Sequence, residues 1–415
     1  FDVLYRLLQH LYPRVTYVRN ITDIDDKIIV RAAERGEEIG ALTERTIRQF
    51  HHDIEALGTL KPDIEPRATD HIHDMIKMIN LLLIQGFAYS AEQHVLFHVP
   101  ALQDYGRLSR RDRDDMVAGA RVEVAPYKKD PADFVLWKPS MDDQVGWNSP
   151  WGRGRPGWHI ECSAMSTKYL GPDFDIHGGG EDLIFPHHEN EIAQSQCAHP
   201  DSSFAQWWLH NGYLRSEGKK MSKSLGNFIT IQDFLNQHSV RILRLLVLKA
   251  HYRSPIDYSD KLLKQTKREL ERIDEFIERL KLCKGKTKTS FPIKKFRKDF
   301  ISVLDDDFNT PKAIAVLFNV VVKGNTAWTK EVLSEKNAKE ILFFLKEIDS
   351  IFGFIFFGRP NILPPPNVIL ELAEKRENFR RRKDWQSADR MRKTLIDWGW
   401  EVADTPKGPR LKKIS

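Results

Sequence analysis

The chain has 415 residues, of which 41% are hydrophobic and 29% charged, and its formal net charge is +6. This length and composition are typical of a globular protein with two to four domains and a large core. They exclude a membrane-spanning helix, because no apolar run approaches the ~18 residues that a span requires. Three cysteines are too few for a disulfide framework, so we expect a reducing, cytoplasmic location.

The N-terminal part alternates between helical and strand-like patterns. Apolar spacing predicts helices over residues 4–11, 24–35, 41–57 and 71–85. The β-branched run at 15–18 predicts a short strand, and Asn20–Asp23 can cap the helix that follows. Such alternation of strand and helix indicates a parallel sheet.

Residues 70–150 have a different character and are predicted to form an inserted module. Short strands are expected at 94–99, 122–124 and 134–137. From residue 151 the strand–helix pattern resumes, with a strand at 174–177 and a helix that begins at Pro186. The segment Trp158–Cys162 is expected to be a strand or turn that enters the next helix.

The chain is almost wholly helical after Leu225. Periodic spacing predicts helices over 258–282, 300–322, 329–346 and 349–357, with a basic linker at 284–295. A proline-rich hinge, Pro360–Pro366, precedes a small terminal module. That module is predicted to contain helices at 368–380 and 385–399, followed by a turn and strands to Lys413.

Three side chains in the middle of the chain have the chemistry of a metal site. Cys162, His187 and Glu191 offer a thiolate, an imidazole and a carboxylate, which are all competent Zn²⁺ ligands. His187 and Glu191 would lie one helical turn apart, with His188 and Glu189 facing away. Each ligand alone would be taken for an ordinary buried or helix-terminal residue. The three together, beside a turn of three glycines, favour the metal.

A lysine-rich string follows the predicted metal site. Lys220–Ser224 reads K-M-S-K-S, begins 29 residues after Glu191 and is followed by L-G-N. Ammonium groups on a short loop can close on a triphosphate and stabilise the charge that grows during attack at the α-phosphorus. The alternative is an exposed basic turn. The full string, K-M-S-K-S followed by L-G-N, is a more specific signal than its positive charge alone. Beside a metal site, it indicates metal-assisted adenylation.

The C-terminal end of the chain is basic. Residues 371–415 contain 13 Lys/Arg and 8 Asp/Glu, a net charge of +5. A basic module suits a phosphate-backbone partner, and Trp385, Trp398 and Trp400 could stack on unpaired bases. The alternative is a solvated helix face, with Trp398 and Trp400 in the core of the module.

These motifs resemble those of the cysteinyl-tRNA synthetases, a family of class I aminoacyl-tRNA synthetases. Lys220–Ser224 is similar to the second signature of that class. The resemblance covers essentially the whole chain through the strings R-N-I-T-D-I-D-D-K-I, G-W-H-I-E-C, H-G-G-G, F-P-H-H-E-N-E, D-D-D-F-N-T-P and K-D-W, at residues 19–28, 157–162, 177–180, 185–191, 305–311 and 383–385.

The resemblance implies an α/β fold: a Rossmann-like parallel-sheet catalytic domain split by an insertion, then an α-helical bundle and a small mixed C-terminal module. The implied segments, in chain order, are a first Rossmann half (1–69), a connective insert (70–150), a second Rossmann half with the zinc ligands (151–215), a lysine-loop region (216–262), a helical bundle that binds tRNA (263–360) and a basic anticodon-binding module (367–415).

The resemblance also implies roles for individual residues. Three of the family's zinc ligands are matched by Cys162, His187 and Glu191. The positions that line the family's cysteine and adenylate pocket are matched by Thr22, Trp158, His177 and Asp182. The lysine that contacts ATP is matched by Lys223, with Lys220 as its partner on the loop. The positions that the family uses to read the anticodon are matched by Arg380, Trp385, Asp389 and Asp404.

The implied reaction is ATP-dependent activation of cysteine to cysteinyl-adenylate, followed by transfer to the 3′ end of tRNA(Cys). One Zn²⁺ per chain would select the cysteine thiolate over serine, and Mg²⁺ would accompany ATP. The short insert carries no evident hydrolytic site, which agrees with an absence of proofreading. The implied protein is a cytoplasmic monomer.

Two features of the family's pattern are absent from the chain. The first signature, H-I-G-H, and the fourth zinc ligand, a cysteine on the first strand, would both lie shortly before Phe1. We expect a longer natural gene product to carry them. On that expectation, the 415-residue chain alone binds zinc poorly and activates cysteine weakly.

Three other functions share part of this pattern. A mycothiol-pathway ligase, which joins cysteine to an amino sugar, would not need the helical and basic region from 260 to 415. A non-catalytic tRNA- or RNA-binding paralogue would explain the missing first signature but not an intact lysine loop with three metal ligands. A structural zinc protein does not account for the lysine loop.

Overall fold

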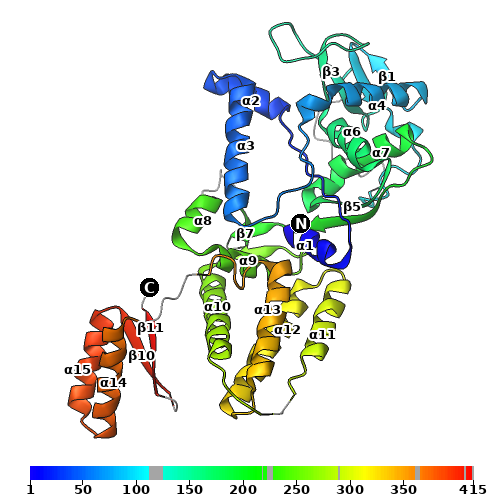
Figure 1. Ribbon diagram of the computed structural model, residues 1–415. Coiled ribbons are helices and arrows are strands. Elements are labelled where there is room, and N and C mark those ends of the chain that lie inside the picture. The colour runs from blue at the N-terminus through cyan, green and yellow to red at the C-terminus, as the bar shows by residue number, and fades with distance from the viewer. Residues whose placement is uncertain are drawn as a thin grey trace. The chain divides into compact units, whose positions relative to one another are not determined.

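The computed structural model describes residues 1–111, 125–216, 218–221, 228–287, 290–359, 365–405 and 408–413. The chain divides into two compact units, Phe1–Gly358 and Arg359–Ser415, which we treat separately (Figure 1). No helix in the described ranges combines the length and the apolar character needed to cross a membrane.

The first unit begins with three helices, α1 (Asp2–Leu11), α2 (Asp26–Arg35) and α3 (Ile39–Ala56). The predicted strand at 15–18 is wrong: this stretch forms only an isolated parallel bridge, from Val18 to Ile64. The predicted cap is also displaced, because Asp25 accepts the backbone N–H of Lys27 and α2 therefore begins at Asp26.

A second layer is an antiparallel sheet with a helix on it. The 3₁₀ turn Ala68–His71 leads into α4 (Ile72–Ile84), and the sheet runs in the order β1 (Ala88–Ala91), β2 (His94–Phe97), β3 (Phe134–Pro139) and β4 (Gly154–Pro156). The predicted strands at 94–99 and 134–137 are confirmed, whereas 122–124 falls outside the described residues. Another 3₁₀ turn, Val99–Ala101, follows β2.

Parallel strand pairing appears where the strand–helix pattern resumes. Helix α6 (Trp158–Leu170) precedes β5 (Asp173–Gly180), and α7 (Glu189–Ala198) precedes β6 (Phe204–Asn211), which pairs with β5 in parallel. This arrangement confirms the predicted α/β class. The segment Trp158–Cys162 is helical rather than a strand or turn, so that expectation was wrong.

The predicted helix at Pro186 begins three residues later than expected. After a 3₁₀ turn (Glu181–Leu183), residues Ile184–His188 form a π-type turn in which Phe185 is extended, with φ −138° and ψ 132°. Regular helix therefore starts only at Glu189. The wider turn places His187 and His188 just before α7, and both are buried.

A small sheet links this region to the helices. Its order is β8 (Lys219–Lys220), β7 (Leu214–Ser216) and β9 (Ile256–Tyr258), and β7 and β9 are parallel. Between β8 and β9 lie α8 (Ile231–Gln237) and α9 (Val240–Leu248).

Four long helices follow as a bundle: α10 (Asp260–Lys281), α11 (Ile293–Asp305), α12 (Thr310–Thr329) and α13 (Glu335–Phe352). The predicted helix at 300–322 is in fact two, because the Asn309 side chain caps α12 at the backbone N–H of Lys312. The predicted helices at 329–346 and 349–357 are replaced by the single helix α13. Its Asp349 carboxylate accepts the N–H groups of Ile355 and Phe356 beyond the helix end.

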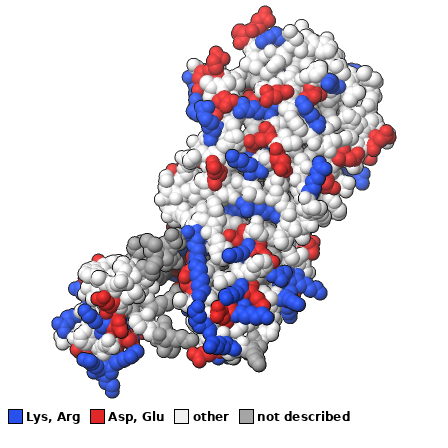
Figure 2. Space-filling model, in the orientation of Figure 1, with Lys and Arg blue, Asp and Glu red and all other residues white. Residues whose placement is uncertain are grey.

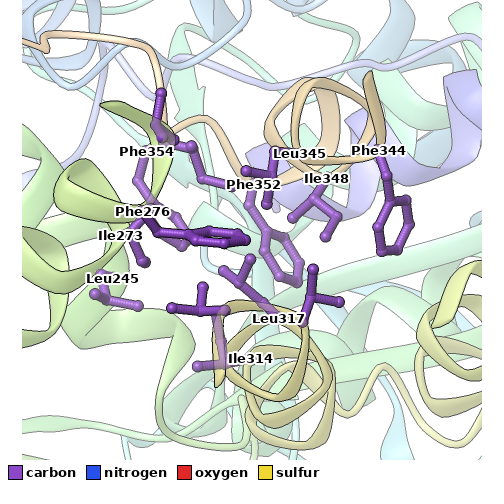
Figure 3. Close-up of a cluster of buried hydrophobic side chains, with 14 of the residues drawn as sticks. Leu245, Ile273, Phe276, Ile314, Leu317, Phe344, Leu345, Ile348, Phe352 and Phe354 are labelled. Atoms are coloured by element: carbon purple, nitrogen blue, oxygen red, sulfur yellow. The ribbon is translucent and has the colours of Figure 1, made fainter. Parts of the chain in front are cut away.

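The bundle encloses a continuous apolar core. Side chains from α9, α10, α12 and α13 meet in its centre (Figure 3), including Leu245, Phe276, Leu317 and Phe352, each no more than 1% exposed. At its edge the buried Arg241 donates to the carbonyls of Phe354 and Ile355 and to Asp274 on α10. Its charge is thereby paired and its donors are used.

The second unit is a helical hairpin with a two-stranded sheet. It contains α14 (Asn367–Arg381), α15 (Trp385–Asp397) and the antiparallel strands β10 (Trp400–Thr405) and β11 (Gly408–Lys413). Trp400 belongs to its core with Ile369 and Leu395, as the alternative interpretation predicted. Trp398 does not, because its side chain is 54% exposed.

Candidate functional site

The candidate site is built around the buried carboxylate of Glu191 on α7. Its two oxygens contact two imidazoles: Oε1 lies 2.9 Å from His187 Nε2, and Oε2 lies 3.2 Å from His177 Nε2 at the end of β5. Burial alone would raise the pKa of Glu191, but these imidazoles hold it well below its usual range. Glu191 therefore carries a negative charge although its side chain is fully buried.

The three predicted metal ligands converge. One donor atom from each of Cys162, His187 and Glu191 lies within 4.8 Å of the other two. Cys162 comes from the second turn of α6, where Asn20 Nδ2 approaches its Sγ at 3.5 Å. Burial, followed by the nearby Glu191 charge, raises the pKa of the Cys162 thiol. A bound cation reverses this tendency, because a coordinating thiol is deprotonated.

A second group of donors shares the same carboxylate. His177, His188 and Glu191 also lie within 4.8 Å of one another. His188 therefore does not face away from the site, contrary to expectation: the π-type turn brings its Nε2 to 4.0 Å from Glu191 Oε1. Burial lowers the pKa of His188 to about 3, and its Nδ1 lies 2.8 Å from His210 Nε2 on β6. The imidazole of His188 is thus neutral and able to act as a ligand or an acceptor.

Two residues at the start of α6 complete the wall. His159 Nδ1 lies 2.8 Å from His187 Nδ1, and burial lowers the pKa of His159 to about 3. A neutral partner at this atom fixes the ring orientation of His187 while its Nε2 faces Glu191. The Trp158 ring lies 4.4 Å from the His187 ring and is 43% exposed, so it forms the rim of the site.

The remaining predicted pocket residues differ in position. Thr22 is joined to the site, because its hydroxyl donates to Glu161 Oε2 at 3.2 Å, one residue before Cys162. Thr22 also lines a cavity of about 260 Å³ between α2 and α3. Asp182 lies in the exposed turn after β5, and no hydrogen bond or ion pair joins it to the site within the described part of the chain.

The lysine loop is only partly described. Lys220 ends β8, where its backbone pairs with Arg215 of β7. Lys223 and the rest of the string, residues 222–227, fall outside the described residues. The predicted contacts of Lys220 and Lys223 with a triphosphate therefore stay predictions.

In the second unit, two of the predicted anticodon residues contact each other. Asp404 on β10 accepts from Arg380 at 2.7 Å and also from Arg376, both on α14. Trp385 and Asp389 lie on α15, and Trp385 is 58% exposed at its first turn. The unit thus offers a free aromatic face, while Asp404 is already an acceptor for two guanidinium groups.

Sequence reasoning missed part of the site. His159, His188 and Asn20 contact predicted ligands, and His210 contacts His188, but none of the four was assigned to the metal site from the sequence. A signal was available for His159, which lies inside the G-W-H-I-E-C string, and for His188, three residues before Glu191. His210 could not be found in this way, because its position depends on the pairing of β5 with β6.

Comparisons with known proteins define the class. Residues 1–268 match the family described as the class I (C) tRNA synthetase catalytic domain, and residues 299–357 match the DALR domain. A methionyl-tRNA synthetase of Mycobacterium tuberculosis shares the fold at a TM-score of 0.62 and 14% identity, over 85% of this chain and 87% of that one. The fold and the site together are those of a class I aminoacyl-tRNA synthetase.

Closer relatives define the family within this class. The cysteine–tRNA ligase of Rhodospirillum rubrum is 50% identical over 417 residues, which cover 100% of this chain and 90% of the relative. That of Xanthomonas euvesicatoria is 45% identical over 426 residues with the same coverage. The chain therefore belongs to the cysteine–tRNA ligase family, and the predicted resemblance is confirmed.

Proposed function

We propose that the protein activates cysteine with ATP and transfers it to the 3′ end of tRNA(Cys). The observation that carries this proposal is the convergence of Cys162, His187 and Glu191 in a chain of this family. A synthetase for cysteine has to recognise a small side chain whose distinguishing group is a thiol. A thiolate, an imidazole and a carboxylate within 4.8 Å form a donor set suited to Zn²⁺.

The donor set fits the metal that the family implies. Zn²⁺ held by Cys162, His187 and Glu191 would ligate the thiolate of substrate cysteine and leave serine, a poorer ligand, unselected. The surrounding chain orients these donors: His177 contacts the second oxygen of Glu191, and His159 contacts the ring of His187. Trp158 at the rim would cover the bound amino acid and exclude water.

The ATP half of the reaction is assigned to other residues. Lys223, with Lys220 beside it, would contact the triphosphate, which Mg²⁺ accompanies. Thr22 and Asp182 would line the adenylate pocket together with His177. Thr22 is better supported than Asp182, because its hydroxyl is hydrogen-bonded to Glu161 beside Cys162.

The tRNA would bind to the basic surfaces of the C-terminal half. A column of lysine and arginine side chains runs along α10 (Figure 2), where Lys261, Lys264, Lys267, Arg268 and Arg272 are exposed. Such a column suits a phosphate backbone. Anticodon contacts are proposed for Arg380, Trp385, Asp389 and Asp404, with Trp385 best placed to stack on a base.

The division of labour along the chain is also a proposal. The Rossmann halves (1–69 and 151–215) with the lysine-loop region (216–262) would perform activation, and the insert (70–150) would lie between them. The bundle (263–360) and the small module (367–415) would bind tRNA. A monomeric protein in the cytoplasm is consistent with this arrangement and stays a prediction.

The test is cysteine-dependent ATP–pyrophosphate exchange by the full natural protein, with serine as the competing substrate. Cys162→Ser should lower exchange with cysteine by about 100-fold or more, because a hydroxyl replaces a metal-binding thiolate, and should weaken ATP binding much less. Cys283→Ser is the matched control, because Cys283 is buried in the bundle core and its Sγ donates to the Leu333 carbonyl.

Two outcomes would contradict the proposal. Equal losses in cysteine and ATP binding for Cys162→Ser would remove the selective role of the site. An absence of any cysteine-dependent exchange, with tRNA binding retained, would support the non-catalytic RNA-binding paralogue instead.

A further inference from the structure

A buried polar bridge joins the two helices that carry candidate metal ligands. Helix α6, with Cys162, packs against α7, with Glu191 (Figure 1). Between them the Ser163 hydroxyl donates to the backbone carbonyl of Glu191 at 3.3 Å, and Gln194 Nε2 donates to Ser163 Oγ at 3.1 Å. Because Ser163 directly follows Cys162 in the chain, one hydroxyl connects the backbone at one ligand to the backbone at another.

The chemistry of the three groups fixes the direction of the bridge. A backbone carbonyl can only accept, so the proton of the Ser163 hydroxyl is directed at Glu191. The hydroxyl oxygen is then an acceptor, and the Gln194 amide presents its NH₂ group to it. Ser163 and Gln194 are both 0% exposed, so neither can exchange its partner for water. The bridge therefore favours one relative position of the two helices.

Packing alone does not require this bridge. The apolar core around α6 and α7 already contains Ile160, Ala164, Ala193 and Cys197. Burial of such groups is favourable by itself, whereas burial of a hydroxyl and an amide costs free energy unless every hydrogen-bonding atom is paired. Gln194 Oε1 is buried and has no hydrogen-bond partner within the described ranges. A bridge with an unpaired buried atom is a poor source of stability, and such departures from ideal packing are expected at functional sites.

The position of the two helices matters for a metal site. Zn²⁺ binds a cysteine sulfur at about 2.3 Å and a histidine nitrogen at about 2.0–2.1 Å, with a tolerance of about 0.2 Å. Cys162 and Glu191 come from different helices, so the spacing of α6 and α7 decides whether both donors reach one ion. His187 lies in the turn that leads into α7 and shares the position of that helix.

We propose that Ser163 and Gln194 are positioning residues that set the spacing of α6 and α7 so that the donor groups on both helices can bind one Zn²⁺. The proposal rests on the proposed function, because it takes these donors as ligands of the metal. The two residues would act only through the helices, since their bridge reaches the backbone carbonyl of Glu191 and not its carboxylate. Removal of groups that orient metal ligands weakens metal binding by about 10- to 100-fold.

The experiment separates metal affinity from stability in the full natural protein. It compares Ser163→Ala, Gln194→Met and the double variant that combines them. Competition with a chelator gives the zinc affinity, and urea unfolding of the metal-free protein gives the stability. Co²⁺ in place of zinc adds a third measurement, because its visible absorption depends on the arrangement of the ligands.

The variants should separate the two quantities. Ser163→Ala leaves the buried Gln194 amide without its acceptor, so both zinc affinity and stability should fall. In the double variant that amide is also gone, so stability should return to about that of the unaltered protein. Its zinc affinity should stay about ten-fold weaker and its Co²⁺ spectrum should be shifted. Gln194→Met alone keeps the donor to Glu191 and should weaken zinc binding less than the double variant does.

Ser195→Ala is the matched control. Ser195 lies on α7 and is 1% exposed, and its hydroxyl has no hydrogen-bond partner in the part of the chain that the structure describes. The same loss of a buried hydroxyl, without loss of a bridge to α6, should change zinc affinity less than about two-fold and leave the Co²⁺ spectrum unshifted.

Three results would overturn the proposal. These are a zinc affinity in the double variant equal to that of the unaltered protein, which would assign the bridge to packing alone, an unshifted Co²⁺ spectrum in that variant, and an equally large loss of zinc affinity in Ser195→Ala. Failure of the proposed function is distinguishable. A protein that binds zinc without cysteine-dependent exchange would contradict the function and leave the zinc comparison intact, whereas a protein that binds no zinc would contradict both.

Discussion

The helical bundle and the candidate metal site both have buried centres, but of opposite chemistry. The bundle buries apolar side chains such as Phe276 and Leu317, whose removal from water is favourable. The site buries the charge of Glu191 among the imidazoles of His187 and His188, which is costly unless the groups satisfy one another. The bundle therefore contributes stability, whereas the surrounding structure holds the site in place for chemistry.

The largest expected effect is on the bundle. Phe276→Ala should lower the free energy of unfolding by about 3–5 kcal/mol, because it removes a ring that is 1% exposed and leaves a cavity. Phe343→Ala is the control, because Phe343 is 61% exposed on α13. The measurement is urea unfolding followed by circular dichroism. A loss below about 1 kcal/mol for Phe276→Ala, or equal losses for both variants, would contradict the role assigned to the core.

A substitution in the candidate metal site should mainly affect metal binding rather than stability. Glu191→Gln should weaken zinc binding about 100-fold, because it removes the buried negative charge of the donor set. Without metal, the variant should lose less stability than Phe276→Ala does, because glutamine keeps the shape of the side chain and can still contact His177 and His187, although it gives up a charge that these imidazoles favour. Competition with a chelator gives the affinity, and urea unfolding without metal gives the stability. A Glu191→Gln protein that unfolds readily and yet retains its zinc affinity would reverse the comparison.

A smaller effect tests how tightly the bundle is packed. A Cβ at Gly324 on α12 would lie 2.3 Å from the Phe276 ring. Overpacking costs about 1–3 kcal/mol, and alanine gains about 1 kcal/mol of helix propensity over glycine, so Gly324→Ala should destabilise by about 1 kcal/mol. Adding Phe276→Leu should recover part of that loss. An additive double variant would show that the two residues do not share this space.

The smallest effect concerns the second unit. Hydrogen bonds and charge from Arg376 hold the pKa of Asp404 below its ordinary value of 3.8. This ion pair therefore contributes stability above that value and loses it as the pH falls through the lower pKa of the folded state. Asp404 is 39% exposed, so the contribution should stay below about 1 kcal/mol. Unfolding of Asp404→Asn at pH 7 and pH 3 tests this, with Asp389→Asn as control. A larger loss for Asp404→Asn at pH 3 than at pH 7 would contradict the sign.

The bundle and the site also differ in what the sequence could predict. Helix α10 follows a long apolar period and was predicted within two residues of its ends, and His187 with Glu191 followed from their spacing. The break between α11 and α12 was missed, because the apolar period continues through it while the Asn309 cap interrupts the helix. The contact of His188 with Glu191 depends on the π-type turn before α7, and that of His188 with His210 on strand pairing between distant segments. Neither leaves a periodic signal.

The most direct test of the account is the zinc content of the purified full natural protein and of its Cys162→Ser variant, measured beside cysteine-dependent ATP–pyrophosphate exchange. We expect about one zinc per chain in the unaltered protein, much less in the variant, and a parallel loss of exchange. Equal zinc in both proteins, or strong cysteine-dependent exchange by a variant without zinc, would contradict the claim that Cys162, His187 and Glu191 form the cysteine-selecting metal site.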